Sequence, residues 1–242
     1  MGNRLAPLYS VYNPQFTFID VHTNSVMKPI YVGLLGVGTV GGGTYTVLKR
    51  NQQEITRRTG RNIVIRMIAD LDQEKVHRLT AGDDVIVTSD ALEVARHPEI
   101  DIVIELMGGQ TIAKQAILEA IAHGKHVITA NKALLAIHGN EIFAAAQQRN
   151  VIVAFEAAVA GGIPIIKALR EGLAANHIEW IAGIINGTSN FILSEMRSKG
   201  LDFTTVLAEA QQLGYAEADP TYDIEGIDAA HKITIMSALA FG

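Results

Sequence analysis

Residues 30–41 read IYVGLLGVGTVG, an apolar run that passes directly into three spaced glycines, Gly36, Gly38 and Gly41. A helical pattern follows, so the G-x-G-x-x-G spacing stands between a strand and a helix. Glycines at these places permit a tight turn, a close backbone approach to a pyrophosphate and close packing of helix on strand. The stretch therefore predicts a dinucleotide-binding turn, with cofactor-binding residues expected at Gly36, Val37, Gly38, Thr39, Val40 and Gly41. The alternative is a glycine turn that binds no ligand.

Apolar β-branched runs alternate with helical patterns beyond this turn. Strands are expected at residues 30–35, 63–69, 85–88, 100–106, 127–130 and 151–155, and helices at residues 40–53, 91–97, 112–123 and 141–149. This alternation predicts an α/β fold built on a doubly wound parallel sheet of the Rossmann type.

The chain is expected to contain three regions. Residues 1–26 are polar and irregular and are interpreted as a poorly ordered extension, and residues 27–155 form the dinucleotide-binding domain. The alternation stops after residue 155, where a smaller α+β domain, 156–242, is expected. Its predicted elements are a helix at 164–173, a strand at 177–185, helices at 189–198 and 202–213, an acidic loop at 214–226 and a helix at 227–240.

Composition narrows the possible functions. The 242 residues are 48% hydrophobic and 19% charged, which is typical of one or two globular domains. The net charge is −5 and no basic run occurs, which argues against nucleic acid or an anionic membrane as partner. The absence of cysteine excludes disulfides, cysteine-ligated metals and a thiolate nucleophile. No secretory signal or membrane span is found and the histidines lack metal-ligand spacing, so we expect a cytoplasmic protein that binds a small molecule, without a transition metal.

Two charged residues follow expected strands, at the carboxyl edge where open sheets bind ligands. Asp70 can accept both ribose hydroxyls of NAD and would repel the 2′-phosphate of NADP, although Lys75 and Arg78 are near enough in sequence to neutralise a phosphate. NAD is therefore favoured over NADP; the alternative for Asp70 is a solvated turn. Lys132 can anchor a polarised oxygen near the nicotinamide, or it can simply extend from a helix start into solvent.

The segment 214–228, GYAEADPTYDIEGID, holds five carboxylates, and Lys232 follows one helical turn later. A cationic ligand such as an amino acid's ammonium group would explain these carboxylates, and so would an ordinary solvated loop. Asp228 and Lys232 are four residues apart and share a helix face, where a surface ion pair is the alternative reading. A lysine beside a carboxylate can act as a general acid–base in an alcohol–carbonyl interconversion.

Together these segments resemble the homoserine dehydrogenase family over residues 28–242. The blocks that carry the resemblance are GLLGVGTVGGG (33–43), IELMGG (104–109), HVITANKALLA (126–136), FEAAVAGGIPIIKALREGL (155–173), IINGTSNFIL (184–193) and AQQLGYAEADPTYDIEGIDAAHK (210–232). The last block matches the family signature in full, including its Asp-x-x-x-Lys.

The resemblance implies an NAD(P)-dependent interconversion of L-homoserine and L-aspartate 4-semialdehyde, on the way to threonine and methionine. It implies that Lys232 moves the proton of the reacting oxygen and that Lys132 contacts both cofactor and substrate. It places Glu217, Asp223 and Asp228 in the substrate site, with Glu217 binding the ammonium group of homoserine, and it places Gly109 and Gly214 at the cofactor. It also implies a monovalent cation, usually sodium, held mainly by backbone carbonyls of Glu156, Val159, Gly161 and Ile163.

Some features depart from the family pattern. Ala69 stands where many members carry an arginine, which again favours NAD. The family continues beyond the last helix and is dimeric through the substrate domain, so we expect an incomplete substrate domain, a homodimer only if that domain is completed, and no regulation through an ACT domain. Two other hypotheses stay open: a module that binds the dinucleotide without turnover, and a different oxidoreductase acting on an amino acid or semialdehyde.

Overall fold

The computed structural model describes residues 28–242, and the extension expected at 1–26 lies outside the described residues. Six strands form one parallel sheet: β1 (Ile30–Leu35), β2 (Ile63–Ala69), β3 (Ile86–Thr88), β4 (Ile102–Glu105), β5 (His126–Thr129) and β6 (Val153–Ala154). Their order is β3-β2-β1-β4-β5-β6, so the connection direction reverses between β1 and β4. This is the doubly wound arrangement that the alternating sequence pattern predicted, and its ligand crevice is expected at the reversal point.

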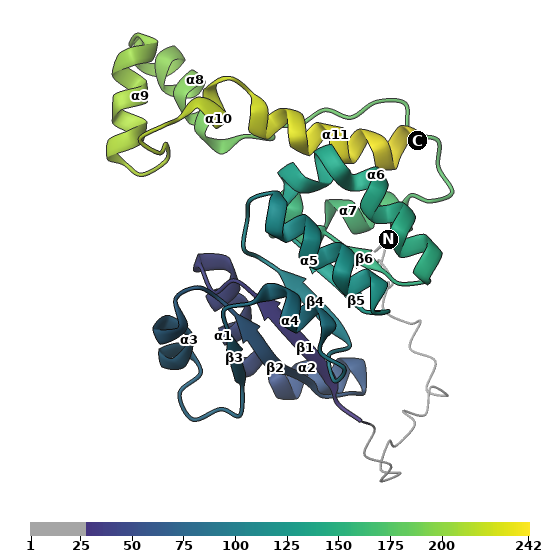
Figure 1. The fold of residues 1–242 in the computed structure, drawn as a ribbon. Helices are drawn as coiled ribbons and strands as arrows, with labels where there is room; N and C mark the ends of the chain where they lie inside the picture. Colours follow the sequence, from purple (N-terminus) through teal and green to yellow (C-terminus); the bar gives the residue numbers. More distant parts are fainter. Residues whose placement is uncertain (1–27) are drawn as a thin grey trace, which may run out of the picture.

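Helices cover both faces of the sheet (Figure 1). The part of the chain that contains the sheet also contains α1 (Thr39–Arg50), α2 (Gln52–Thr59), α3 (Gln73–Leu79), α4 (Ala91–Arg96), α5 (Thr111–Ala122) and α6 (Lys132–Arg149). Alternate residues of β1 enter different cores, because successive strand side chains point to opposite faces. Leu34 packs in the cluster that contains Tyr45 of α1 and Val76 of α3, whereas Leu35 packs in the larger cluster with α4, α5 and α6.

Three helix boundaries in this part of the chain differ from expectation. The helix expected at 40–53 is divided into α1 and α2 at Asn51. No range was predicted for α3, whose N-terminus is capped by the Asp72 carboxylate, which accepts a hydrogen bond from Lys75 N. α6 begins at Lys132 instead of 141, because the Asn131 side chain caps it by accepting from Leu134 N. Gly139 lies inside this helix and is buried, and a Cβ atom there would lie 3.3 Å from the Phe143 ring.

The remaining elements are helical. They are the 3₁₀ segment Glu156–Ala158, α7 (Ile165–Lys167) with the π-helical turn Ala168–Gly172, α8 (Gly187–Lys199), α9 (Phe203–Gln212), α10 (Thr221–Ile224) and α11 (Ile227–Phe241). α8 and α9 pack through Ile192, Val206 and Ala210. α11 runs along α6, and α8–α10 gather around the N-terminal end of α11 (Figure 1).

The strand expected at 177–185 is wrong for the residues that the structure describes. A strand needs a neighbour to pair its backbone groups, and no strand after β6 is present within 28–242. The segment instead packs Ile178, Ile181 and Ile185 against the main core and leaves Trp180 and Ile184 exposed.

None of the helices within residues 28–242 has both the length and the apolar character that a membrane span needs.

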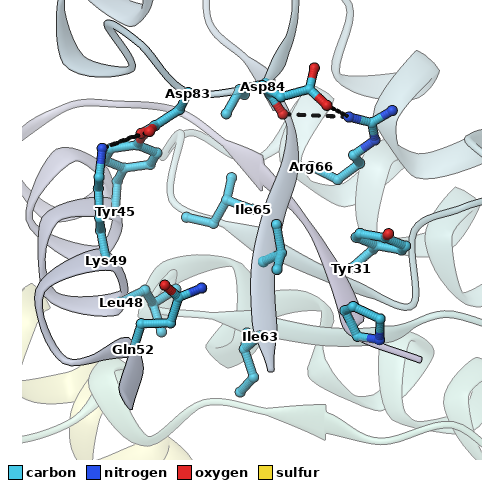
Figure 2. Close-up of a pocket in the computed structure, with 13 residues that line it drawn as sticks. Tyr31, Tyr45, Leu48, Lys49, Gln52, Ile63, Ile65, Arg66, Asp83 and Asp84 are labelled. Atoms are coloured by element: carbon cyan, nitrogen blue, oxygen red, sulfur yellow. Dashed lines mark hydrogen bonds and ion pairs between the residues drawn. The ribbon is translucent and has the colours of Figure 1, made fainter. Parts of the chain in front are cut away.

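A cavity of about 340 Å³ lies beside the part of β2 that β3 does not reach (Figure 2). Its charged groups are all paired with one another. Lys49 and the Tyr45 hydroxyl both donate hydrogen bonds to Asp83, and Arg66 binds Asp84 at 2.7 Å. Because these charged groups already bind one another, we interpret the cavity as a structural feature. The bonds from Lys49 and Tyr45 to Asp83 hold the loop before β3 against α1.

The packing of α1 on β1 generates the first prediction. A Cβ atom on Gly41 would lie 1.9 Å from the carbonyl oxygen of Gly36, and backbone cannot move aside as a flexible side chain can. We expect Gly41→Ala to lower the free energy of unfolding by about 1–3 kcal/mol in denaturant titrations. Gly43→Ala is the matched control, since its Cβ would meet nothing within 4 Å. Equal stability of the two variants would contradict the close packing.

Candidate active site

The glycine turn lies where the sheet order reverses. Gly36 has a φ of +89°, and a Cβ there would lie 2.8 Å from the Leu106 carbonyl oxygen, so the turn sits tightly against the chain that follows β4. α1 begins at Thr39 after Gly38, and no side chain caps its first amides. A Cβ on Gly38 would meet nothing within 4 Å, which leaves the backbone open to a ligand. Free helix amides beside open glycine backbone fit a pyrophosphate.

A cavity of about 630 Å³ extends from this turn across the end of β2, within the size range of ligand sites. Asp70 lines it, and its two carboxylate oxygens accept hydrogen bonds from Val37 N at 2.6 Å and Asp72 N at 2.9 Å. Asp70 therefore ties the glycine turn to the end of β2 besides facing the cavity. Lys75 lines the same cavity, whereas Arg78 pairs with Glu74 at 3.6 Å. These residues fit the adenosine half of a dinucleotide.

A second cavity, of about 260 Å³, lies on the other side of the turn, above the ends of β4 and β5. Glu105 forms its floor and is fully buried; its carboxylate accepts from the amides of Met107 and Gly108 and from the Thr129 hydroxyl at 2.6 Å. Asn131 holds the same loop by donating to the Gly109 carbonyl at 2.6 Å. Sequence analysis placed Gly109 at this edge but gave no role to Glu105 or Asn131. A carboxylate at the end of a buried strand, next to paired glycines, was the available signal.

Two lysines share one buried carboxylate beside this cavity. Lys232 Nζ of α11 lies 2.6 Å from Asp228 Oδ2, and Lys132 Nζ of α6 lies 3.2 Å from Asp228 Oδ1. Asn186 donates to Asp228 Oδ2 at 2.9 Å, and Lys232 also donates to the Ile185 carbonyl oxygen at 2.8 Å. The helical spacing predicted the pairing of Asp228 with Lys232. It could not predict that Lys132, from the other half of the chain, meets them.

The Asp228 carboxylate is charged despite its burial. Burial by itself would raise the pKa of Asp228, but hydrogen bonds from Lys232, Asn186 and Lys132 outweigh it and hold the pKa below its ordinary value. Two ammonium groups are thus fixed by one anion, and both lie where an oxygen of a ligand could accept from them. Such an arrangement stabilises negative charge that develops on a hydroxyl or carbonyl oxygen.

A third cavity, of about 570 Å³, opens on the α8–α11 side of the lysine pair. Several predicted site residues line it together, namely Gly214, Asp223, Asp228 and Lys232, along with Asn186, Gly187, Thr188, Phe191 and Tyr215. Glu217 is exposed and is not among them. Asn186 was not predicted as a site residue; it bridges Asp223 and Asp228 with its amide group while its oxygen caps α8. The site thus consists of neighbouring cavities separated by the two lysines.

The turn proposed for a monovalent cation follows β6. The Glu156 carboxylate accepts from the amides of Ile166 and Lys167, so in this structure it caps α7. Ile163 closes the turn: its amide donates to the Ala160 carbonyl oxygen, and its own carbonyl oxygen accepts from the Ile165 amide. Each of these carbonyl oxygens keeps a second lone pair. Hard cations prefer such oxygens, so the backbone is chemically suitable. Among residues 28–242 no cluster of three or more His, Asp or Glu side chains could hold a metal ion.

Comparisons with known proteins agree with this geometry. The family model described as "Homoserine dehydrogenase, NAD binding domain" matches residues 36–156, and the homoserine dehydrogenase model matches residues 164–242. The chain is similar to homoserine dehydrogenases of Pseudomonas aeruginosa (62% identical) and Neisseria gonorrhoeae (64% identical), each over 216 residues, 89% of this chain and 49% of the relative.

Solved structures give the same result. A homoserine dehydrogenase from Thiobacillus denitrificans superposes with a TM-score of 0.84 at 66% identity, covering 89% of this chain and 49% of that one. A hyperthermophilic archaeal homoserine dehydrogenase in complex with NADPH superposes with a TM-score of 0.76 at 27% identity, covering 89% and 70%. The chain spans about half the length of the curated relatives it matches. With the parallel sheet, the glycine turn and the signature residues in place, the chain belongs to the homoserine dehydrogenase family.

Proposed function

We propose that this protein acts as an NAD(P)-dependent dehydrogenase that interconverts L-homoserine and L-aspartate 4-semialdehyde. The observation that carries the proposal is the pair of lysines, Lys132 and Lys232, held by Asp228 between a cavity beside the glycine turn and a cavity lined by carboxylates. A dinucleotide-binding module without turnover would have no use for this arrangement. The nicotinamide would supply the hydride acceptor or donor.

The chain's own residues divide the remaining tasks. The glycine turn and the first amides of α1 bind the pyrophosphate, and Gly109 and Gly214 bring backbone close to the cofactor. Lys232, as the neutral amine, would accept the hydroxyl proton when the alcohol is oxidised, and the resulting ammonium would return that proton in the reverse direction. Lys132 adds a second positive charge beside the same oxygen, which stabilises an alkoxide-like transition state. Asn186 acts as a positioning residue, since it touches Asp228 and Asp223.

The carboxylates suit the other end of an amino-acid substrate. Asp223 lines the cavity that contains Lys232, and we assign it to the ammonium group of homoserine. Glu217, which the family resemblance assigned to this ammonium group, is exposed and does not line the cavity, so it would join Asp223 only after a movement of residues 214–219. We also retain, as parts of the proposal, a homodimer and a sodium ion at the backbone carbonyls of Glu156, Val159, Gly161 and Ile163.

The proton-transfer role of Lys232 can be tested separately from cofactor binding. We expect Lys232→Ala to lower kcat for L-homoserine oxidation by about 100- to 10,000-fold, because the general base is lost. The Kd for NADH should change by about twofold or less, since Lys232 lies away from the glycine turn. Turnover is followed by reduced-nicotinamide absorbance and binding by its fluorescence. Lys199→Ala is the control, because Lys199 is exposed and pairs with Glu195 and Glu209, outside the cavities of the site. Loss of NADH affinity equal to the loss of turnover would contradict the proposed role.

The buried charge of Asp228 predicts a pH dependence of stability. Its pKa is depressed in the folded protein, so its contribution is present above the unfolded-state pKa of about 4 and is lost as the pH falls through the lower folded-state value. We therefore expect the difference in unfolding free energy between the wild type and Asp228→Asn to be constant from about pH 5 to 8 and to shrink below about pH 4. Thermal unfolding across this range measures it. A difference that grows towards acid pH would show that Asp228 is not ionised when buried.

Cofactor preference provides a third test. Asp70 faces the adenosine cavity and favours NAD, whereas Lys75 on the same cavity would attract a 2′-phosphate. We expect Lys75→Ala to lower kcat/KM about 10-fold with NADP and to leave it nearly unchanged with NAD, since only the phosphate contact is removed. Arg78→Ala is the matched control, because Arg78 pairs with Glu74 and does not line the cavity. An equal effect of Lys75→Ala on both cofactors would exclude a phosphate contact.

A further inference from the structure

One residue of the nicotinamide-side cavity comes from outside the sheet domain. The other lining residues belong to the glycine turn, to the segments that follow β4 and β5 or to the first turn of α6, namely Val40, Glu105, Leu106, Gly108, Ala130, Asn131, Lys132 and Ala133. The exception is Tyr222, which projects from α10. Its side chain is about half exposed, so the ring is open on the cavity side and is not buried in a hydrophobic core.

The short helix that carries Tyr222 is held on both sides. The Asp219 carboxylate accepts from the amide and the hydroxyl of the preceding Thr221, at 3.1 and 2.5 Å. The following Asp223 accepts from Asn186 through its carboxylate at 2.7 Å and from Ser189 through its carbonyl at 3.1 Å. An exposed aromatic residue on such a fixed turn loses little further freedom when it contacts a ligand.

The rear of the Tyr222 ring rests on the catalytic helix. Its centroid lies 6.0 Å from that of His231, with the two rings at 61°, an edge-to-face contact. His231 is next to Lys232 in α11, and its Nδ1 is buried without a hydrogen-bond partner among the described residues. The imidazole therefore supports the tyrosine by packing. Tyr222 thus spans from the helix of Lys232 to the cavity that contains Lys132.

The positions of the two cavities on either side of the glycine turn indicate which part of the cofactor Tyr222 would contact. With the pyrophosphate at the glycine turn and the adenosine in the larger cavity at the end of β2, the nicotinamide half must extend towards β4 and β5, where Tyr222 lies. We propose that Tyr222 is a cofactor-contacting residue that covers the nicotinamide from the α8–α11 side. This inference rests on the proposed function.

Two consequences follow for the reaction. A ring placed over the nicotinamide excludes water from the position where hydride is transferred, between the cofactor and the two lysines. It also makes nicotinamide binding depend on the placement of α10 and α11, because the same segment supplies the ring and Lys232. Tyr222 acts by ring contact and orientation, and it takes no proton in this scheme.

The test compares ligands that contain or lack the nicotinamide. NADH and ADP-ribose are titrated into the wild type, Tyr222→Ala, Tyr222→Phe and the control Ile224→Ala, whose side chain is on the same helix but does not line the cavity. We expect Tyr222→Ala to raise the Kd for NADH about 10-fold, as loss of an aromatic contact does. The Kd for ADP-ribose should change by less than about twofold in every variant, and Tyr222→Phe should bind NADH as the wild type does.

The outcomes separate this inference from the proposed function. If the wild type binds NADH and Tyr222→Ala binds it equally well, or if NADH and ADP-ribose weaken together, Tyr222 does not contact the nicotinamide although the dehydrogenase proposal stands. If the wild type binds neither ligand, the proposed function fails and this inference fails with it. An effect of Tyr222→Phe as large as that of Tyr222→Ala would also overturn the ring contact, since only the hydroxyl would then matter.

Discussion

The close approach of α1 to the turn that precedes it is the constraint on which the rest of the structure depends. Gly36 and Gly41 leave no room for a Cβ atom, so the first turn of α1 lies directly against the end of β1. This places uncapped helix amides at the point where the sheet order reverses. A dinucleotide anchored there has two directions to follow, one towards Asp70 and the other towards Lys132. The role proposed for each of the other candidate site residues depends on which of these two directions it lies in.

Asp228 has a comparable role for the chemistry. A buried carboxylate is stabilising only when its partners satisfy it, and here two ammonium groups and an amide do so. The Asp228 carboxylate also holds the two positively charged lysine side chains close together beside a cavity, although like charges repel each other. Because one lysine starts α6 and the other lies on α11, the same interaction also aligns the two halves of the site.

Whether a feature of this structure could be predicted from the sequence depends on how far apart in the chain the residues that form it lie. The strands and the glycine turn are set by local periodicity and spacing, and the Asp228–Lys232 pair follows from one turn of helix, so all of them were predicted. The sequence pattern placed the start of this helix at residue 141, and the Asn131 cap, which accepts from Leu134 N, explains why α6 begins at Lys132. The segment 177–185 has a strand-like composition, yet strands are defined by partners. The contacts of Lys132 with Asp228 and of Tyr222 with the cofactor cavity join distant parts of the chain, which no local pattern encodes.

The two halves of the site differ in how they are formed. Backbone amides, glycines and the buried Glu105 shape the cofactor side, and all of them belong to the sheet or to its adjoining loops. The side that holds the two lysines depends on side-chain contacts between α6, α10 and α11. Under the proposed function, cofactor binding at the pyrophosphate would depend on the sheet domain, whereas proton transfer would also depend on the position of α11. A change at the contacts between these helices should consequently act first on the nicotinamide end and on turnover, because the lysine pair and Tyr222 are the groups that make them.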